Sequence, residues 1–212
     1  MRTPVELSPI PVTTAPATRL TRLFAGLVCY GTSMAMMTRS GLGLNPWDVL
    51  HEGVADRTTL TFGMVTALTA VLVLLLWIPL RQRPGVGTVA NVVVIAVVVD
   101  VVRALLPDAH QLGWQIGLLL GGIVLNGFAT AVYVGARLGP GPRDGLMTGL
   151  SARTGRSVRL VRTAIELIVL AAGWLLGGTV GVGTVLYALA IGPLTQLFLP
   201  YVTWSPRTRR AR

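Results

Sequence analysis

The chain has 212 residues and a formal net charge of +10; 52% of its residues are hydrophobic and only 12% are charged. A soluble domain carries about 25% charged residues, so this composition excludes an ordinary soluble protein and predicts an all-α membrane protein in contact with the lipid bilayer. All 18 basic residues are arginines spread around the ends of apolar segments, so the charge gives no reason to predict nucleic-acid binding.

The chain begins with a segment rich in proline and threonine, 1–19, which has no apolar period and predicts a flexible tail. Apolar stretches follow, each near the ~20 residues that cross a bilayer. They predict six transmembrane helices, at 20–38, 60–80, 86–106, 114–134, 158–176 and 180–201. The segment 203–212 predicts a basic tail.

A shift of 96 residues superimposes the first half of the chain on the second and predicts two membrane repeats, 20–106 and 113–202. It places the motif at 42–53 on 138–149, and it matches the Gly-Val-Gly-Thr-Val segments at 85–89 and 181–185 without a difference. These glycine segments predict close packing at the start of the third helix of each repeat. Three spans per repeat reverse the second repeat in the membrane, which predicts inverted repeats.

The arginine distribution predicts the orientation. With the amino terminus inside, fifteen of the eighteen arginines face the cytoplasm, and only Arg39, Arg57 and Arg103 lie outside. Both termini are therefore predicted to be cytoplasmic.

Each repeat contains a short motif between its first and second spans, and each motif predicts a short interfacial or re-entrant helix. In the first copy Asn45 suits the N-cap, proline follows, and Asp48 stands in the first turn. The second copy keeps the proline and Asp144 but has Gly141 and Arg143 where the first has Asn45 and a tryptophan. Two interpretations remain open: the aspartates only cap helices, or they line a pathway through the membrane.

Three further polar residues lie within the apolar stretches. Asn91 and Asn126 predict hydrogen bonds between helices, with contact to a ligand as the alternative. Glu166 lies ~12 Å into the fifth predicted span, counted at about 1.5 Å per residue, and Arg162 is its expected partner. Two interpretations remain open: Glu166 and Arg162 form a purely structural pair, or Glu166 binds a proton or a cationic ligand.

The sequence contains no catalytic arrangement, so no enzymatic activity, cofactor or metal is predicted. His51 precedes Glu52, but no second histidine stands at the spacing that a zinc helix requires.

The first motif copy at 41–50, its second copy at 138–146 and the Gly-x-Gly-Thr segments resemble the YczE/YyaS/YitT group of bacterial integral membrane proteins, nearest the YczE branch. The resemblance covers about 20–201. It implies a bacterial cytoplasmic-membrane protein without an established activity, and some members of the group are linked to secondary-metabolite production.

Two functions are consistent with these features. The first is transport or export of a small molecule, because two antiparallel repeats can form one arrangement open to each side of the membrane. The alternative is a scaffold or accessory protein that regulates a cytoplasmic partner through the arginine-rich segment 137–162 and the basic tail. A homo-oligomer also remains open.

Overall fold

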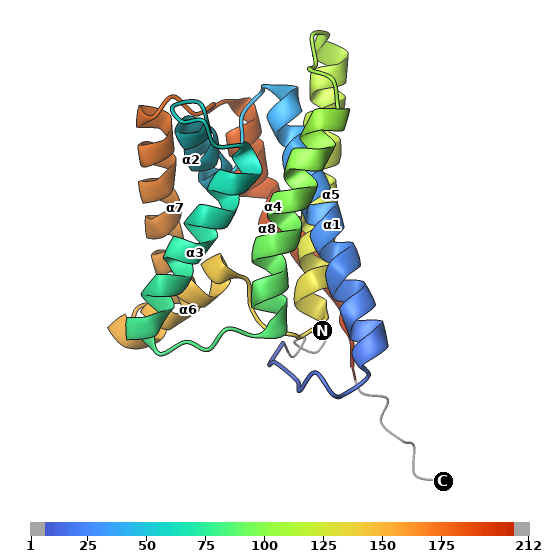
Figure 1. The fold of residues 1–212 in the computed structure, drawn as a ribbon, viewed down its shortest axis with the longest axis vertical. Helices are drawn as coiled ribbons and strands as arrows, with labels where there is room; N and C mark the ends of the chain where they lie inside the picture. Colours follow the sequence, from blue (N-terminus) through green and yellow to red (C-terminus); the bar gives the residue numbers. More distant parts are fainter. Residues whose placement is uncertain (1–6, 206–212) are drawn as a thin grey trace.

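The computed structural model describes residues 7–205, and these residues form a bundle of α-helices (Figure 1). The all-α prediction is therefore confirmed for this part of the chain. The helices are α1 (Pro16–Ser40), α2 (Pro46–Ala55), α3 (Phe62–Leu80), α4 (Val86–Leu105), α5 (Leu112–Gly135), α6 (Pro142–Thr154), α7 (Val158–Leu175) and α8 (Val182–Val202).

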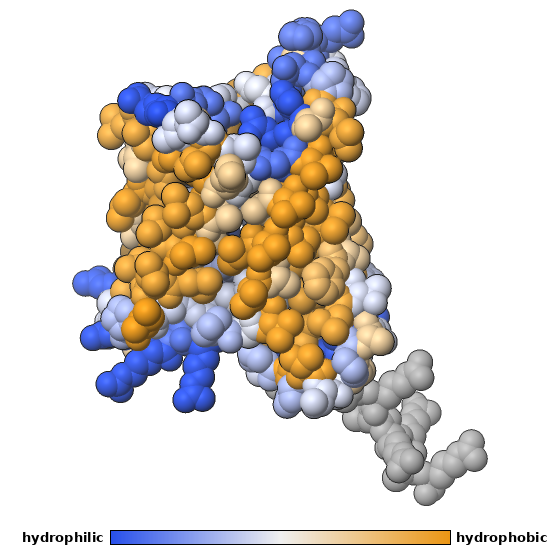
Figure 2. Space-filling view, viewed as in Figure 1, coloured by the Kyte–Doolittle hydropathy of each residue, from blue (hydrophilic) through white to orange (hydrophobic). Residues whose placement is uncertain are grey.

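Four of these helices, α3, α4, α5 and α8, are long and apolar enough to cross a membrane. Figure 2 shows the corresponding band of apolar side chains, with hydrophilic side chains gathered at both ends of the molecule. The predicted total of six spans is thus supported in part. The helices α1 and α7 are not among these four. Both carry charged side chains: Arg19, Arg22 and Arg39 in α1, and Arg159, Arg162 and Glu166 in α7.

The 96-residue shift found in the sequence also relates the starts of the helices. The helices α1 to α4 begin at residues 16, 46, 62 and 86, and α5 to α8 begin at 112, 142, 158 and 182. The short helices α2 and α6 lie at opposite ends of the molecule (Figure 1). We refer to α1–α4 as the first half and to α5–α8 as the second half.

The two halves meet along α1 and α5, which pack closely. A β-carbon added at Gly26 of α1 would lie 2.8 Å from the backbone nitrogen of Tyr133 in α5, so only glycine permits this approach. Leu23, Leu27 and Val99 are fully buried in the same apolar cluster. The short helices join the halves a second time, because α2 packs on α7 and α6 packs on α3.

The Gly-Val-Gly-Thr segments fix the third long helix of each half against the other half. The amide of Gly87 donates a 2.9 Å hydrogen bond to the carbonyl of Leu138, and the amide of Gly183 donates a 2.8 Å bond to the carbonyl of Leu42. These pairs correspond under the 96-residue shift. The predicted close packing at the starts of these helices is confirmed.

The contact of α6 with α3 gives a first prediction. Trp77 of α3 is 2% exposed, and a β-carbon added at Gly145 of α6 would lie 2.0 Å from its indole ring. We expect Gly145→Ala to lower stability by about 1–3 kcal/mol through overpacking, measured as a lower melting temperature in detergent. Gly113→Ala is the control, because the added β-carbon meets nothing within 4 Å. An unchanged melting temperature in Gly145→Ala would contradict this packing.

The ends of the chain are described in part. Helix α1 begins at Pro16, inside the segment predicted as a tail at 1–19, and Ile10 donates a 3.1 Å hydrogen bond to the carbonyl of Arg137. Residues 1–6 and 206–212 lie outside the described residues, and with them most of the basic tail predicted at 203–212.

Candidate functional site

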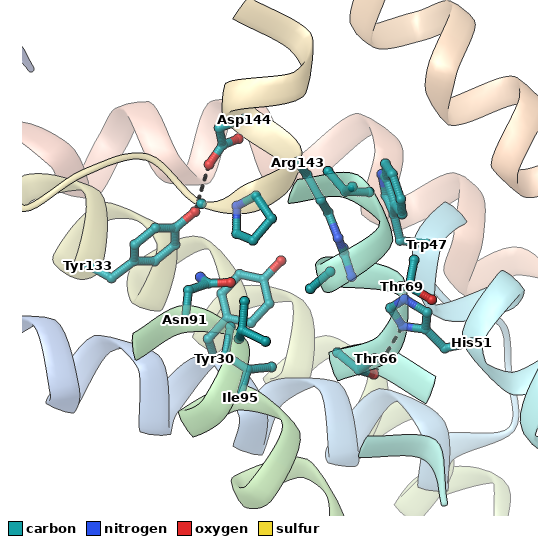
Figure 3. Close-up of a pocket in the computed structure, with 15 residues that line it drawn as sticks. Tyr30, Trp47, His51, Thr66, Thr69, Asn91, Ile95, Tyr133, Arg143 and Asp144 are labelled. Atoms are coloured by element: carbon teal, nitrogen blue, oxygen red, sulfur yellow. Dashed lines mark hydrogen bonds between the residues drawn. The ribbon is translucent and has the colours of Figure 1, made fainter. Parts of the chain in front are cut away.

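Two adjoining cavities, of about 70 and 230 Å³, lie between the halves of the molecule. Figure 3 shows the smaller one, which lies among α1 to α6. The larger one extends between α7 and α8. The side chains common to both cavities come from both halves: Tyr30, Trp47, Tyr133, Arg143 and Asp144.

The start of α2 positions the first motif. The side-chain oxygen of Asn45 accepts hydrogen bonds from the amides of Trp47 and Asp48 at 3.1 and 3.0 Å, so the predicted N-cap is confirmed. Asp48 is fully buried, and its Oδ2 accepts a hydrogen bond from the amide group of Asn45 rather than from the helix backbone. Its Oδ1 makes no hydrogen bond within the described chain and lies 3.4 Å from Nδ1 of His51.

His51 follows Asp48 by one turn and is fully buried. Its Nδ1 lies 3.2 Å from the hydroxyl of Thr66, which donates its own hydrogen to the carbonyl of Phe62. A proton on Nδ1 of His51 serves both the threonine oxygen and the nearby Oδ1 of Asp48, so we assign the proton to Nδ1. Nε2 is then an acceptor, and it has no hydrogen-bond partner among the described residues.

The second motif brings opposite charge to the first. The guanidinium of Arg143 lies 4.8 Å from the centre of the Trp47 ring, a cation–π contact. Its Nη2 lies 3.8 Å from Oδ1 of Asp48. Asp144 accepts a 2.9 Å hydrogen bond from the hydroxyl of Tyr133. The arginine that replaces tryptophan in the second copy thus stacks on the tryptophan of the first.

The larger cavity contains the predicted pair of Arg162 and Glu166. Nε of Arg162 donates a 2.8 Å hydrogen bond to Oε1 of Glu166, whose side chain is 30% exposed. The ligand-binding role of Glu166 stays a prediction. In the first half, Thr66 and Ala70 occupy the corresponding positions and line the smaller cavity.

The structure collects most of the predicted site residues in this region, but not all. Asn91 lines the smaller cavity beside Asp144 and Arg143 (Figure 3). Asn126 lines neither cavity: it donates a 2.8 Å hydrogen bond to the hydroxyl of Ser33 and accepts a 3.0 Å bond from Tyr187. It therefore serves as a link between helices, which was one of its two interpretations.

Sequence analysis missed the tyrosines of the site. Tyr30, Tyr133 and Tyr187 come from α1, α5 and α8, and each lines at least one cavity. Their signal in the sequence is a phenol within an otherwise apolar stretch, where a buried hydroxyl usually requires a hydrogen-bond partner. Among residues 7–205, no three His, Cys, Asp or Glu side chains group as metal ligands.

The sequence profile of a family described as a family of unknown function, DUF6198, matches residues 17–200. A Haemophilus influenzae protein named only as uncharacterized is 41% identical over 184 residues, which cover 87% of this chain and 84% of the relative. The Bacillus subtilis uncharacterized membrane protein YczE is 35% identical and covers 86% of each chain. YyaS of Bacillus subtilis is 25% identical, over 84% of this chain and 90% of its own.

These matches confirm the resemblance to YczE and YyaS. No solved structure matches the chain significantly. The apolar helices and the relation to YczE together identify a multi-pass membrane protein.

Proposed function

We propose a transport function for this chain, which belongs to the DUF6198 family. In this proposal six helices cross the membrane as two inverted repeats, and a small molecule passes through the site between them. The observation that carries the proposal is the polar cavity pair between the halves, which Arg143 and Asp144 line, with the buried carboxylate of Asp48 3.8 Å from Arg143. A charged cluster within a membrane bundle is costly to bury and is typical of a substrate or ion pathway.

The arrangement of the helices supports the inverted repeats. Corresponding helices begin 96 residues apart, and the corresponding short helices α2 and α6 lie at opposite ends of the bundle (Figure 1). Inverted repeats place a substrate site at their interface, with short or broken helices around it. In this proposal α1 and α7 also cross the membrane, with their charged residues at helix ends or facing the cavities.

One pair of helices closes its end of the site. The start of α3 meets α4 at Asp100, whose carboxylate accepts a 2.7 Å hydrogen bond from the amide of Gly63 and a second bond from the hydroxyl of Thr61. The backbones approach so closely that a β-carbon added at Gly63 would lie 2.1 Å from the carbonyl oxygen of Ala96. We call this contact the α3–α4 latch.

The corresponding pair, α7 and α8, is open. These helices share almost no close contact, and the larger cavity lies between them. Arg159 and Gln196 stand where the latch has Gly63 and Asp100. Because Arg159 cannot permit the same close approach, this pair would close through longer side chains. The asymmetry supports alternating access, and in this proposal the latch end is the closed end and the α7–α8 end is the open one.

The arginine distribution assigns the two ends in this proposal. The open α7–α8 pair faces the end that carries α6 and the arginine-rich segment 137–162, which we assign to the cytoplasm. Both termini are cytoplasmic in this orientation, and the α3–α4 latch closes the outer end.

Transport predicts that cells with and without the protein distribute at least one metabolite differently between cytoplasm and medium. We expect wild type to change this distribution and Arg143→Gln to lose the change at equal abundance in the membrane, measured by untargeted metabolite analysis of both compartments. Arg156→Gln, at an exposed position, is the control. If no metabolite follows the presence of wild type, the transport function is wrong.

The alternative of a scaffold that regulates a cytoplasmic partner remains open. A scaffold requires an exposed recognition surface, which the arginines at the α6 end could supply, but it requires no polar cavity between the halves. The cavities therefore favour transport.

A further inference from the structure

The donors of Arg143 are the largest set of unused hydrogen-bonding groups in the site. The guanidinium carries five N–H donors, yet Arg143 makes no hydrogen bond within residues 7–205. Its nearest carboxylate oxygen, Oδ1 of Asp48, lies at 3.8 Å, beyond hydrogen-bond distance. The amide of Asn91, which lines the same cavity, also makes no hydrogen bond to a described residue. Both side chains lie at the cavity in Figure 3.

Each carboxylate of the site, in contrast, already has one donor, although Oδ1 of Asp48 has none within the described chain. Asp48 accepts from Asn45, Asp144 from Tyr133 and Glu166 from Arg162. Among the described residues, the unpartnered donors that line the cavities belong to Arg143 and Asn91, whereas the unpartnered acceptors, Oδ1 of Asp48 and Nε2 of His51, are buried behind the cavity surface. A ligand that reaches Arg143 must therefore supply acceptors.

We propose that the site binds a small carboxylate, which the guanidinium of Arg143 holds through two parallel hydrogen bonds. The planar fork of arginine matches the two oxygens of a carboxylate, and its charge strengthens both bonds. The stack on Trp47 holds the guanidinium plane at the junction of the two cavities. Nη2, the nitrogen that lies 3.8 Å from Asp48, carries two hydrogens, so one can bind the ligand while the other stays on the side of Asp48.

The side chains that line the two cavities indicate the chemistry of the ligand beyond its carboxylate. The rings of Tyr30, Trp47 and Tyr133 border both cavities, and Val73 and Ile95 border the smaller one. Aromatic and aliphatic walls favour an apolar or planar body attached to the carboxylate.

That the bound carboxylate is a transported substrate rests on the proposed function, but the carboxylate site itself is tested by binding alone. We would titrate purified wild-type protein in detergent with acetate, pivalate, benzoate and phenylacetate, each beside its amide, and with benzylammonium as a cation. Melting temperature and isothermal calorimetry report binding. We expect at least one carboxylate to bind and its amide to bind far more weakly.

The variants locate the binding group. Arg143→Gln should weaken carboxylate binding on the order of 100-fold, because two charge-assisted hydrogen bonds are lost. Arg143→Lys keeps the charge without the fork and should weaken it roughly tenfold. Arg156→Gln should bind like wild type. Size-exclusion chromatography and circular dichroism verify that each variant is folded.

Three results would overturn the carboxylate site: no carboxylate of the set binds, amides or benzylammonium bind as well as carboxylates, or Arg143→Gln and Arg143→Lys both bind like wild type. Carboxylate binding without any metabolite redistribution in cells would leave the site standing and reject transport. Redistribution of metabolites without carboxylate binding would support transport and reject the carboxylate site.

Discussion

Replacement of Arg19 by glutamine is expected to destabilise the protein by about 3 kcal/mol or more. The side chain is fully buried near the start of α1. Its guanidinium donates hydrogen bonds of 2.7 to 3.0 Å to backbone carbonyls only, those of Ile10, Pro11, Thr14, Ala136 and Arg137. Each carbonyl left without a donor in a buried place costs about 1–3 kcal/mol.

The effect should be large because Arg19 joins three parts of the chain. Its partners belong to the segment before α1 and to the end of α5, and its guanidinium also lies 5.2 Å from the centre of the Trp204 ring. We expect a lower melting temperature in detergent and a lower abundance in the membrane. Arg22→Gln is the control, because Arg22 donates one hydrogen bond, to Val202 at 3.1 Å. Equal stability of the two variants would contradict this role of Arg19.

Arg19 also shows why the sequence predicts more of the fold than of the contacts between distant residues that build a site. From the sequence it is one of fifteen arginines that indicate the cytoplasmic side, and nothing nearby distinguishes it from Arg22. Its burial follows from carbonyl groups at the end of α5, more than 100 residues away. Local patterns do not contain such partners, because only the packing of α1 on α5 brings them together.

Contacts between residues that are close together in the sequence were predictable. The cap by Asn45 involves residues two and three positions ahead, and the pair of Arg162 and Glu166 lies one helical turn apart. The constant shift of 96 residues also carries information on the whole chain, since it relates all four helix starts of the two halves. Residue identity at a matched position was less informative: Asn126 corresponds to Tyr30, yet only Tyr30 borders the cavities.

The stack of Arg143 on Trp47 could not be predicted from the sequence, for another reason. The two residues occupy the same position in the two motif copies, so the sequence suggested only that the second copy had lost its tryptophan. In the fold the motifs face each other, and the difference becomes a contact. A departure from symmetry in the sequence is therefore a favourable place to look for a site between repeats.

A covalent link across the α3–α4 latch is expected to stop transport completely. Alternating access requires the outer end to open, and the latch holds α3 against α4 through Thr61, Gly63 and Asp100. We would place cysteines at Thr61 and Asp100 in a Cys29→Ala background, since Cys29 is the protein's single cysteine. A short bifunctional methanethiosulfonate would join them, and reduction would release them.

The matched pair at Ser157 and Gln196 provides the control, because it occupies the corresponding positions of the open α7–α8 pair. We expect the latch pair to link quickly and the control pair slowly in the resting protein. The rate of linking is measured as the loss of free thiols that react with a maleimide. Linking the latch should abolish the redistribution of metabolites in cells, and reduction should restore it. In a protein that carries both pairs, one link should prevent the other, because alternating access closes one end at a time. Simultaneous links in an active protein would contradict alternating access, since neither end could then open.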